Sequence, residues 1–96
     1  GQIPIDPATG QIAEPCIDVQ TEQVMKNIKG LLESQGLDFK DVIKTTVFVK
    51  NMSDFAKVNE LYGKYFSVDA PARSCVEVSC LPKNVLLEVE AIALLK

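Results

Sequence analysis

The 96-residue sequence contains no histidine and no tryptophan. Without histidine, the chain cannot form a Ser-His-Asp triad, a Cys-His nucleophilic pair or a histidine-ligated metal site. Aromatic residues make up 6% of the sequence, which disfavours a stacking platform for nucleic-acid bases. Any chemistry must therefore come from carboxylates, amines, guanidinium groups, thiols, hydroxyls or the backbone.

The chain also lacks an excess of positive charge and a long apolar run. Ten basic residues are scattered among thirteen acidic ones, and the net charge is −3. A nucleic-acid partner is disfavoured because phosphate recognition needs a basic face. No apolar run approaches the roughly 18 residues of a membrane span, so we expect no membrane partner either.

Three cysteines, an odd number, occur without CxxC spacing. This pattern indicates neither a disulfide framework nor a zinc site. Reduced thiols favour a cytoplasmic compartment, with the mitochondrion as an alternative. Cys16 and Cys80 resemble ordinary small apolar residues, whereas Cys75 shares a strand face with Arg73.

The apolar periodicity predicts a single α+β domain over residues 1–96, with two helices on one face of a mixed sheet. The first helix is expected from Ile17 to about Gln35, with Asp18 as its N-cap and Gly36 at its C-terminal end. The remaining predicted elements are a strand tail over residues 1–5, a strand over 42–50, a helix with the stripe Phe55, Val58, Tyr62 and Tyr65, and strands over 71–78 and 88–93.

The last two predicted strands carry an unusual polar face. Arg73, Cys75 and Glu77 alternate with apolar residues on one strand, and Glu88 and Glu90 do so on the other. If residues 81–84 form a hairpin loop, Cys80 pairs with Val85 and Glu77 with Glu88, and the guanidinium, thiol and carboxylates share one side of the sheet. Such a face suits a small carboxylated substrate. The alternative is a solvated face whose charges pair across strands for little net energy.

Two helices can cover only one face of the sheet. The other face is expected to mix these charges with Ile92 and with apolar residues of the middle strand, such as Ile43, Val47 and Val49 or their alternates. It is too apolar to lie fully in water and too charged for a simple core. Packing against copies of the same chain would resolve this and place the charged positions in clefts between subunits.

Several segments of the chain together resemble the RidA (YjgF) family, also called endoribonuclease L-PSP. They are GQIPIDP at the start, KTTVFVK at 44–50, DFAKVN at 54–59, PARSCVEV at 71–78, LPK at 81–83 and EVEAIA at 88–93. The resemblance implies a chorismate-mutase-like (ferredoxin-like) fold, a homotrimer with clefts at its interfaces and no cofactor or metal. It also implies hydrolysis of 2-imino acids and enamines, such as 2-iminobutanoate and 2-iminopropanoate, to 2-ketoacids and ammonia.

The same resemblance suggests roles for individual residues. Arg73 matches the arginine that holds the substrate carboxylate, and Glu88 matches the acidic residue that positions or activates water. Cys75 matches the pocket cysteine whose backbone lines the site, so a nucleophilic thiol is unnecessary. Gly1 and Asn59 match further substrate-binding positions, although Asn59 equally suits the solvent side of a helix.

The chain departs from the family pattern at its start, where family members carry two further strands. We therefore expect a domain that is truncated at its N-terminus, with one sheet edge exposed and one pocket wall missing. A non-catalytic trimer that binds 2-ketoacids is the main alternative function. An endoribonuclease is a weaker alternative, because the chain is acidic and lacks histidine.

Overall fold

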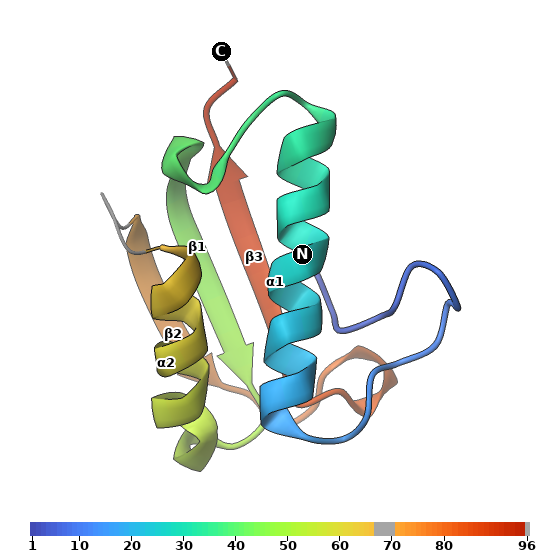
Figure 1. The fold of residues 1–96 in the computed structure, drawn as a ribbon. Coiled ribbons are helices and arrows are strands. Elements are labelled where there is room, and N and C mark those ends of the chain that lie inside the picture. The colour runs from blue at the N-terminus through green and yellow to red at the C-terminus, as the bar shows by residue number, and fades with distance from the viewer. Residues whose placement is uncertain (67–70, 96) are drawn as a thin grey trace.

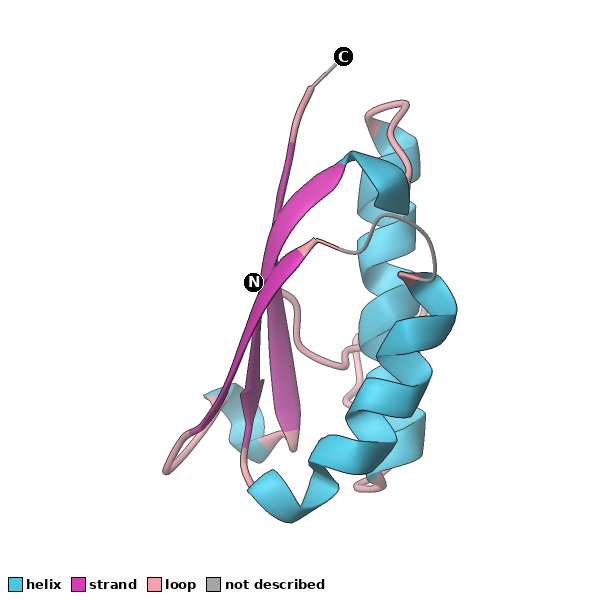
Figure 2. Cartoon of the chain, turned by 90° about the vertical axis from the view of Figure 1, so that its left-hand side faces the viewer, coloured by secondary structure: helices cyan, strands magenta, loops and turns pink. Residues whose placement is uncertain are grey.

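The computed structural model describes residues 1–66 and 71–95. Its main elements are helix α1 (Ile17–Ser34), strand β1 (Val42–Val49), helix α2 (Phe55–Tyr65), strand β2 (Ala72–Glu77) and strand β3 (Leu87–Ala93). Both helices lie on the same side of the sheet, so the molecule has two layers (Figures 1 and 2). The predicted α+β architecture, with two helices on one face, is confirmed.

Strand β1 is the centre of the sheet, with β2 on one side and β3 on the other. β2 runs parallel to β1, and β3 runs antiparallel to it. Helix α2 connects β1 to β2, as parallel neighbours require a crossover rather than a tight turn. The β-branched run of β1 suits this position, because its buried residues Val47 and Val49 are at most 1% exposed.

The predicted hairpin between β2 and β3 is wrong, because β1 lies between these strands. The connection passes the end of β1: Val78 N–H donates to the Val49 carbonyl, and Lys50 N–H donates to the Leu86 carbonyl, each at 2.9 Å. A short 3₁₀ helix, Pro82–Asn84, occupies the segment predicted as the hairpin loop. The expected pairs Cys80–Val85 and Glu77–Glu88 therefore do not form. Alternation identifies a strand but does not identify its neighbour.

Helix α1 ends as the sequence predicts. Gly36 has a φ of +69°, which a glycine adopts without steric cost. Its N–H donates to the Glu33 carbonyl at 3.0 Å, and the Leu37 N–H donates to the Leu32 carbonyl at 2.8 Å. These two bonds are a Schellman motif, which satisfies carbonyls that the last helical turn leaves free.

The start of α1 differs from the prediction. The N-cap is Cys16, whose side chain makes no capping hydrogen bond, and Asp18 lies inside the first turn. Asp18 instead forms an ion pair of 3.4 Å with Lys57 of α2. Because about half or more of each side chain is exposed, this pair contributes little to stability.

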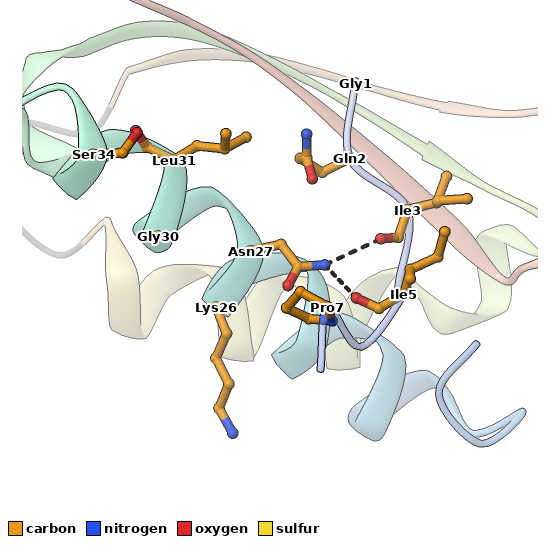
Figure 3. Close-up of a pocket in the computed structure, with 10 residues that line it drawn as sticks. All are labelled: Gly1, Gln2, Ile3, Ile5, Pro7, Lys26, Asn27, Gly30, Leu31 and Ser34. Carbon is orange, nitrogen blue, oxygen red and sulfur yellow. Dashed lines mark hydrogen bonds between the residues drawn. The ribbon is translucent and has the colours of Figure 1, made fainter. Parts of the chain in front are cut away.

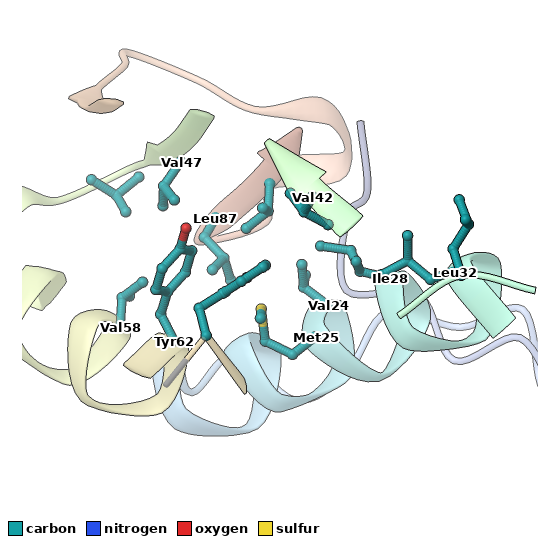
Figure 4. Packing of buried hydrophobic residues seen from close by; sticks show 13 residues of the cluster. Val24, Met25, Ile28, Leu32, Val42, Val47, Val58, Tyr62 and Leu87 are labelled. Carbon is teal, nitrogen blue, oxygen red and sulfur yellow. The ribbon is translucent and has the colours of Figure 1, made fainter. Parts of the chain in front are cut away.

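The hydrophobic core fills the space between the helices and the sheet (Figure 4). Leu31 of α1 lies outside this core and is 53% exposed. Met25, on the opposite flank of the buried face of α1, is fully buried. The core consists of Val24, Met25, Ile28, Leu32, Leu37, Val42, Val47, Val49, Val58, Tyr62, Phe66, Leu87 and Val89.

The segment before α1 runs along the outer edge of β3. Gln2 forms an antiparallel bridge with Val89, and Ile5 forms one with Ile12, so the predicted strand tail is present here as two isolated bridges. Asn27 of α1 donates to the carbonyls of Ile3 and Ile5, at 3.4 Å and 2.8 Å (Figure 3). These bonds hold the segment against α1.

Candidate functional site

The guanidinium of Arg73 lies against helix α2. Its carbon Cζ is 4.8 Å from the ring centroid of Tyr62 and 5.4 Å from that of Phe55. Its Nη1 donates to Oδ1 of Asn59 at 2.5 Å. Phe55, Asn59 and Tyr62 are spaced i, i+4 and i+7, so one face of α2 presents all three to the arginine. The structure thus brings together Arg73 and Asn59, two of the predicted site residues.

An open cleft of about 390 Å³ lies beside this arginine. Its lining consists of Asn59, Tyr62, Gly63, Phe66, Pro71 and Arg73. Within residues 1–66 and 71–95, no carboxylate forms an ion pair with Arg73. The cleft therefore combines polar groups and the ring surfaces of Tyr62, Phe66 and Pro71 with a cation that retains hydrogen-bond donors, as a site for a small organic anion needs.

Cys75 lies two residues along β2, on the same face as Arg73. It is half-buried and packs against the core. Burial raises the pKa of the Cys75 thiol, and the positive charge of Arg73 offsets part of that increase. The thiol is therefore protonated at neutral pH, which makes it a poor nucleophile. This agrees with the expectation that no nucleophilic thiol is needed.

Glu88 and Gly1 lie together, away from the arginine. The bridge between Gln2 and Val89 sets the start of the chain beside β3. A Cβ atom built on Gly1 would overlap the Glu88 carboxylate at Oε2. A residue with a side chain would therefore push the end of this half-buried carboxylate aside and change its position.

Within one chain, Arg73 and Glu88 lie on opposite faces of the sheet, and the predicted shared face is wrong. Arg73 is the register partner of Thr45, whose side chain is buried under the helices. Glu88 is the register partner of Phe48, three positions further along β1. Because successive side chains of a strand alternate, partners of Thr45 face the helices and partners of Phe48 face away.

The other predicted acidic neighbour of Glu88 also lies elsewhere. Glu77 is the register partner of Val49, on the helix-covered face. Its Oε1 accepts a hydrogen bond of 2.6 Å from the Met52 N–H, just before α2. Glu77 is thus a structural residue that anchors the start of α2, whereas Glu90 does share the open face with Glu88.

Sequence reasoning placed Phe55 and Tyr62 in a core stripe and missed their contact with Arg73. The sequence spacing alone places Phe55, Asn59 and Tyr62 on one face of a helix. The crossover that lays α2 over β2 was needed to connect that face with the arginine.

A larger groove lies elsewhere and is poorly suited to catalysis. It measures about 600 Å³ and runs between α1 and residues 1–7 (Figure 3). Lys26 is the one ionisable side chain among its lining residues, which are otherwise apolar, amide, hydroxyl or glycine. In the described part of the chain, no cluster of three carboxylate or thiol ligands could hold a metal ion. The described helices also include none long and apolar enough to span a membrane.

Comparison with known proteins identifies the family. The family model described as endoribonuclease L-PSP matches residues 1–95. A RutC family protein of Pyrococcus horikoshii is 59% identical over 97% of this chain and 74% of its own length. A protein of Salmonella typhimurium named 2-iminobutanoate/2-iminopropanoate deaminase is 51% identical, again over 97% and 74%.

The fold comparison agrees. The crystal structure of Escherichia coli TdcF with bound serine superposes with a TM-score of 0.93 at 42% identity, covering all of this chain and 77% of that one. The chain therefore belongs to the RidA family, whose family model is described as endoribonuclease L-PSP.

Proposed function

We propose that this chain hydrolyses 2-imino acids to 2-ketoacids and ammonia. The observation that carries the proposal is the Arg73 guanidinium, which is oriented by α2, borders an open cleft and has no carboxylate partner among the described residues. Relatives named 2-iminobutanoate/2-iminopropanoate deaminase support the same chemistry.

Arg73 binds the substrate through its carboxylate. One N–H of the guanidinium is used by Asn59, which leaves other in-plane donors for two parallel, charge-assisted hydrogen bonds. This contact orients the imino acid so that its electrophilic carbon C2, next to the carboxylate, has a defined position. A relative whose structure carries bound serine supports recognition of a small molecule of this kind.

Glu88 acts from a second copy of the chain. The two groups lie on opposite faces of one sheet, so a single chain cannot direct both at one substrate. The open face around Glu88 exposes the apolar residues Ile43, Val76 and Ile92, which favours its packing against another subunit. In a closed ring, the Arg73 edge of one subunit would meet the Glu88 face of its neighbour. The homotrimer implied by the family resemblance is one such ring.

The reaction then needs one water and one proton relay. Glu88 accepts a proton as water adds to C2 of the protonated imine, which forms a carbinolamine. Glu88 returns that proton to the nitrogen, and as the C–N bond breaks it takes the proton of the C2 hydroxyl, so that C2 becomes a carbonyl and ammonia leaves. The proton then passes from Glu88 to the ammonia, which departs as ammonium, and the Glu88 carboxylate is regenerated. Arg73 holds the carboxylate throughout. No step requires a thiol nucleophile.

The proposal predicts that Arg73→Ala and Glu88→Gln each abolish the acceleration of imine hydrolysis. The loss at Glu88 is expected to be about 10²- to 10⁴-fold, the usual contribution of one general acid–base group. The assay follows 2-iminobutanoate, generated by a threonine dehydratase, as it is converted to 2-oxobutanoate and ammonia.

Glu90→Gln is the matched control, because Glu90 lies two residues along the same strand and on the same face. It should retain most of the activity. Rates like those of the wild type in either site variant would reject the assignment. Binding of 2-oxobutanoate without any turnover would favour the non-catalytic binding module instead.

A further inference from the structure

We infer that Tyr62 and Thr45 are positioning residues that hold the Arg73 guanidinium in the orientation needed to bind a carboxylate. This inference rests on the proposed function, because it assigns the support of the same arginine. Three residues from three elements take part: Thr45 from β1, Tyr62 from α2 and Arg73 from β2.

The ring of Tyr62 contacts the guanidinium at a distance typical of cation–π attraction. Cζ of Arg73 is 4.8 Å from the ring centroid. Contact through the flat face of a guanidinium leaves its N–H groups, which point outward in the plane, available to a ligand. Asn59 takes one of those donors and thereby sets the rotation of the plane. Tyr62 thus restrains the cation without competing for the hydrogen bonds that a carboxylate needs.

Tyr62 is itself restrained by Thr45. The two hydroxyl oxygens are 2.6 Å apart and buried, and the residues are 5% and 1% exposed. Burial raises the pKa of Tyr62, while the bond to Thr45 and the charge of Arg73 oppose that increase. The ring is therefore a neutral phenol at physiological pH, and its attraction for the arginine comes from the π face.

The sheet register explains why Thr45 serves this purpose. Thr45 is the register partner of Arg73 on the neighbouring strand, so both side chains rise on the same face beneath α2. The other buried positions on this face of β1 are the valines Val42, Val47 and Val49. A buried hydroxyl among them costs free energy unless it is paired, and Tyr62 provides the partner.

The experiment measures ligand affinity and turnover in three variants of the full chain. Tyr62→Leu removes the ring, Tyr62→Phe removes the hydroxyl, and Thr45→Val removes the partner of that hydroxyl. For Tyr62→Leu, we expect the Kd for 2-oxobutanoate and the KM to rise about 3- to 30-fold, as loss of a cation–π contact predicts. Thr45→Val should raise both about 2- to 10-fold. We expect kcat to change less than KM, because the arginine binds the carboxylate in both ground and transition states.

A control separates positioning from stability. Ile28→Val removes one buried methylene from α1 and leaves the residues around Arg73, which are Phe55, Asn59 and Tyr62, unchanged, so it should lower stability without changing Kd. NMR provides a readout that needs no ligand and no activity. The guanidinium signals of Arg73 should show a ring-current shift that persists in Tyr62→Phe and decreases in Tyr62→Leu to the part contributed by Phe55.

The outcomes distinguish this inference from the proposed function. If the wild type binds 2-oxobutanoate and folded Tyr62→Leu binds it equally well, the positioning role is overturned and the proposed function stands. If the wild type neither binds nor turns over substrate, the proposed function fails. In that case the ring-current shift still decides whether Tyr62 orients Arg73, and a shift that is the same in the wild type and in Tyr62→Leu overturns the inference.

Discussion

Two buried polar side chains, Gln20 and Thr45, form hydrogen bonds that join separate elements of the fold. Gln20 is 2% exposed, donates to the Ala13 carbonyl at 3.2 Å and accepts from the Leu86 N–H at 2.8 Å. It thereby ties the segment before α1 and the segment before β3 to α1. Thr45 pairs in the same way with Tyr62. Such groups are tolerated in a core because each has a hydrogen-bond partner.

Cysteine alkylation tests the environment assigned to Cys75. Because burial raises the pKa of this thiol, its thiolate fraction at pH 7.5 is low and it should react with iodoacetamide several-fold more slowly than an exposed cysteine. Cys16 and Cys80 are exposed and provide internal references. Peptide mass spectrometry of a time course measures all three rates together.

The charge of Arg73 predicts in which direction the alkylation rate of Cys75 changes when the arginine is replaced. That charge lowers the pKa of Cys75 relative to burial alone, so Arg73→Gln should slow the alkylation of Cys75 further. Faster alkylation of Cys75 in this variant would contradict the electrostatic assignment. Labelling of Cys75 ahead of both references in the wild type would contradict its burial.

At the scale of elements, helix ends and strand order have different origins. The end of α1 is encoded locally, because Gly36 alone permits the positive φ that closes the Schellman motif. Strand order is not local. The parallel pairing of β1 with β2 depends on the crossover through α2, which also lays Tyr62 and Asn59 over Arg73.

Two glycine substitutions near the end of α1 should have opposite effects on stability. Gly36→Ala forces a side chain into a left-handed conformation and should lower the free energy of unfolding by about 1–2 kcal/mol. Gly30→Ala lies in the helix interior, where an added Cβ meets nothing within 4 Å. It should raise the free energy of unfolding by about 0.5–1 kcal/mol.

Urea denaturation of both variants, monitored by circular dichroism, gives the comparison directly. The activity of Gly30→Ala serves as the control that the fold is unchanged. Equal free energies of unfolding for the two variants would show that the positive φ of Gly36 is not needed to end the helix.

At the scale of the whole molecule, the open face of the sheet and the edge strand β2 carry complementary parts of one proposed site. Glu88 faces away from the helices, whereas Arg73 faces them from the outer strand β2. Exposed apolar residues such as Val76 and Ile92 lie on the Glu88 side. Assembly of several copies is therefore part of the proposed mechanism, and it is testable without a structure of the assembly.

Mixing two inactive variants tests a shared site. When Arg73→Ala and Glu88→Ala chains are unfolded together in equal amounts and refolded, random assembly should restore about a quarter of the wild-type activity, because one interface in four then carries both native residues. Each variant refolded alone should stay inactive, and size-exclusion chromatography should confirm assembly in all samples. Recovery that fails despite normal assembly would mean that the two groups do not act across one interface.

The sequence by itself determined the class of the fold, the two helices, most strand positions and the residues of chemical interest. These depend on period, turn residues and side-chain type, which are local properties. The helix at 17–34, which is followed by Gly36, illustrates this. The absence of histidine, also a property of the sequence alone, excludes histidine-dependent catalysis and histidine-ligated metal sites.

Only the tertiary structure decided which strand lies beside which. The alternation of β2 and β3 is compatible with a hairpin or with a strand between them, because a period of two fixes the faces of a strand and leaves its neighbours open. Placing β1 between them put Arg73 under α2 and Glu88 on the opposite face. The contact of Arg73 with Tyr62 and Asn59 likewise joins residues from separate elements, and packing of the whole chain brings them together.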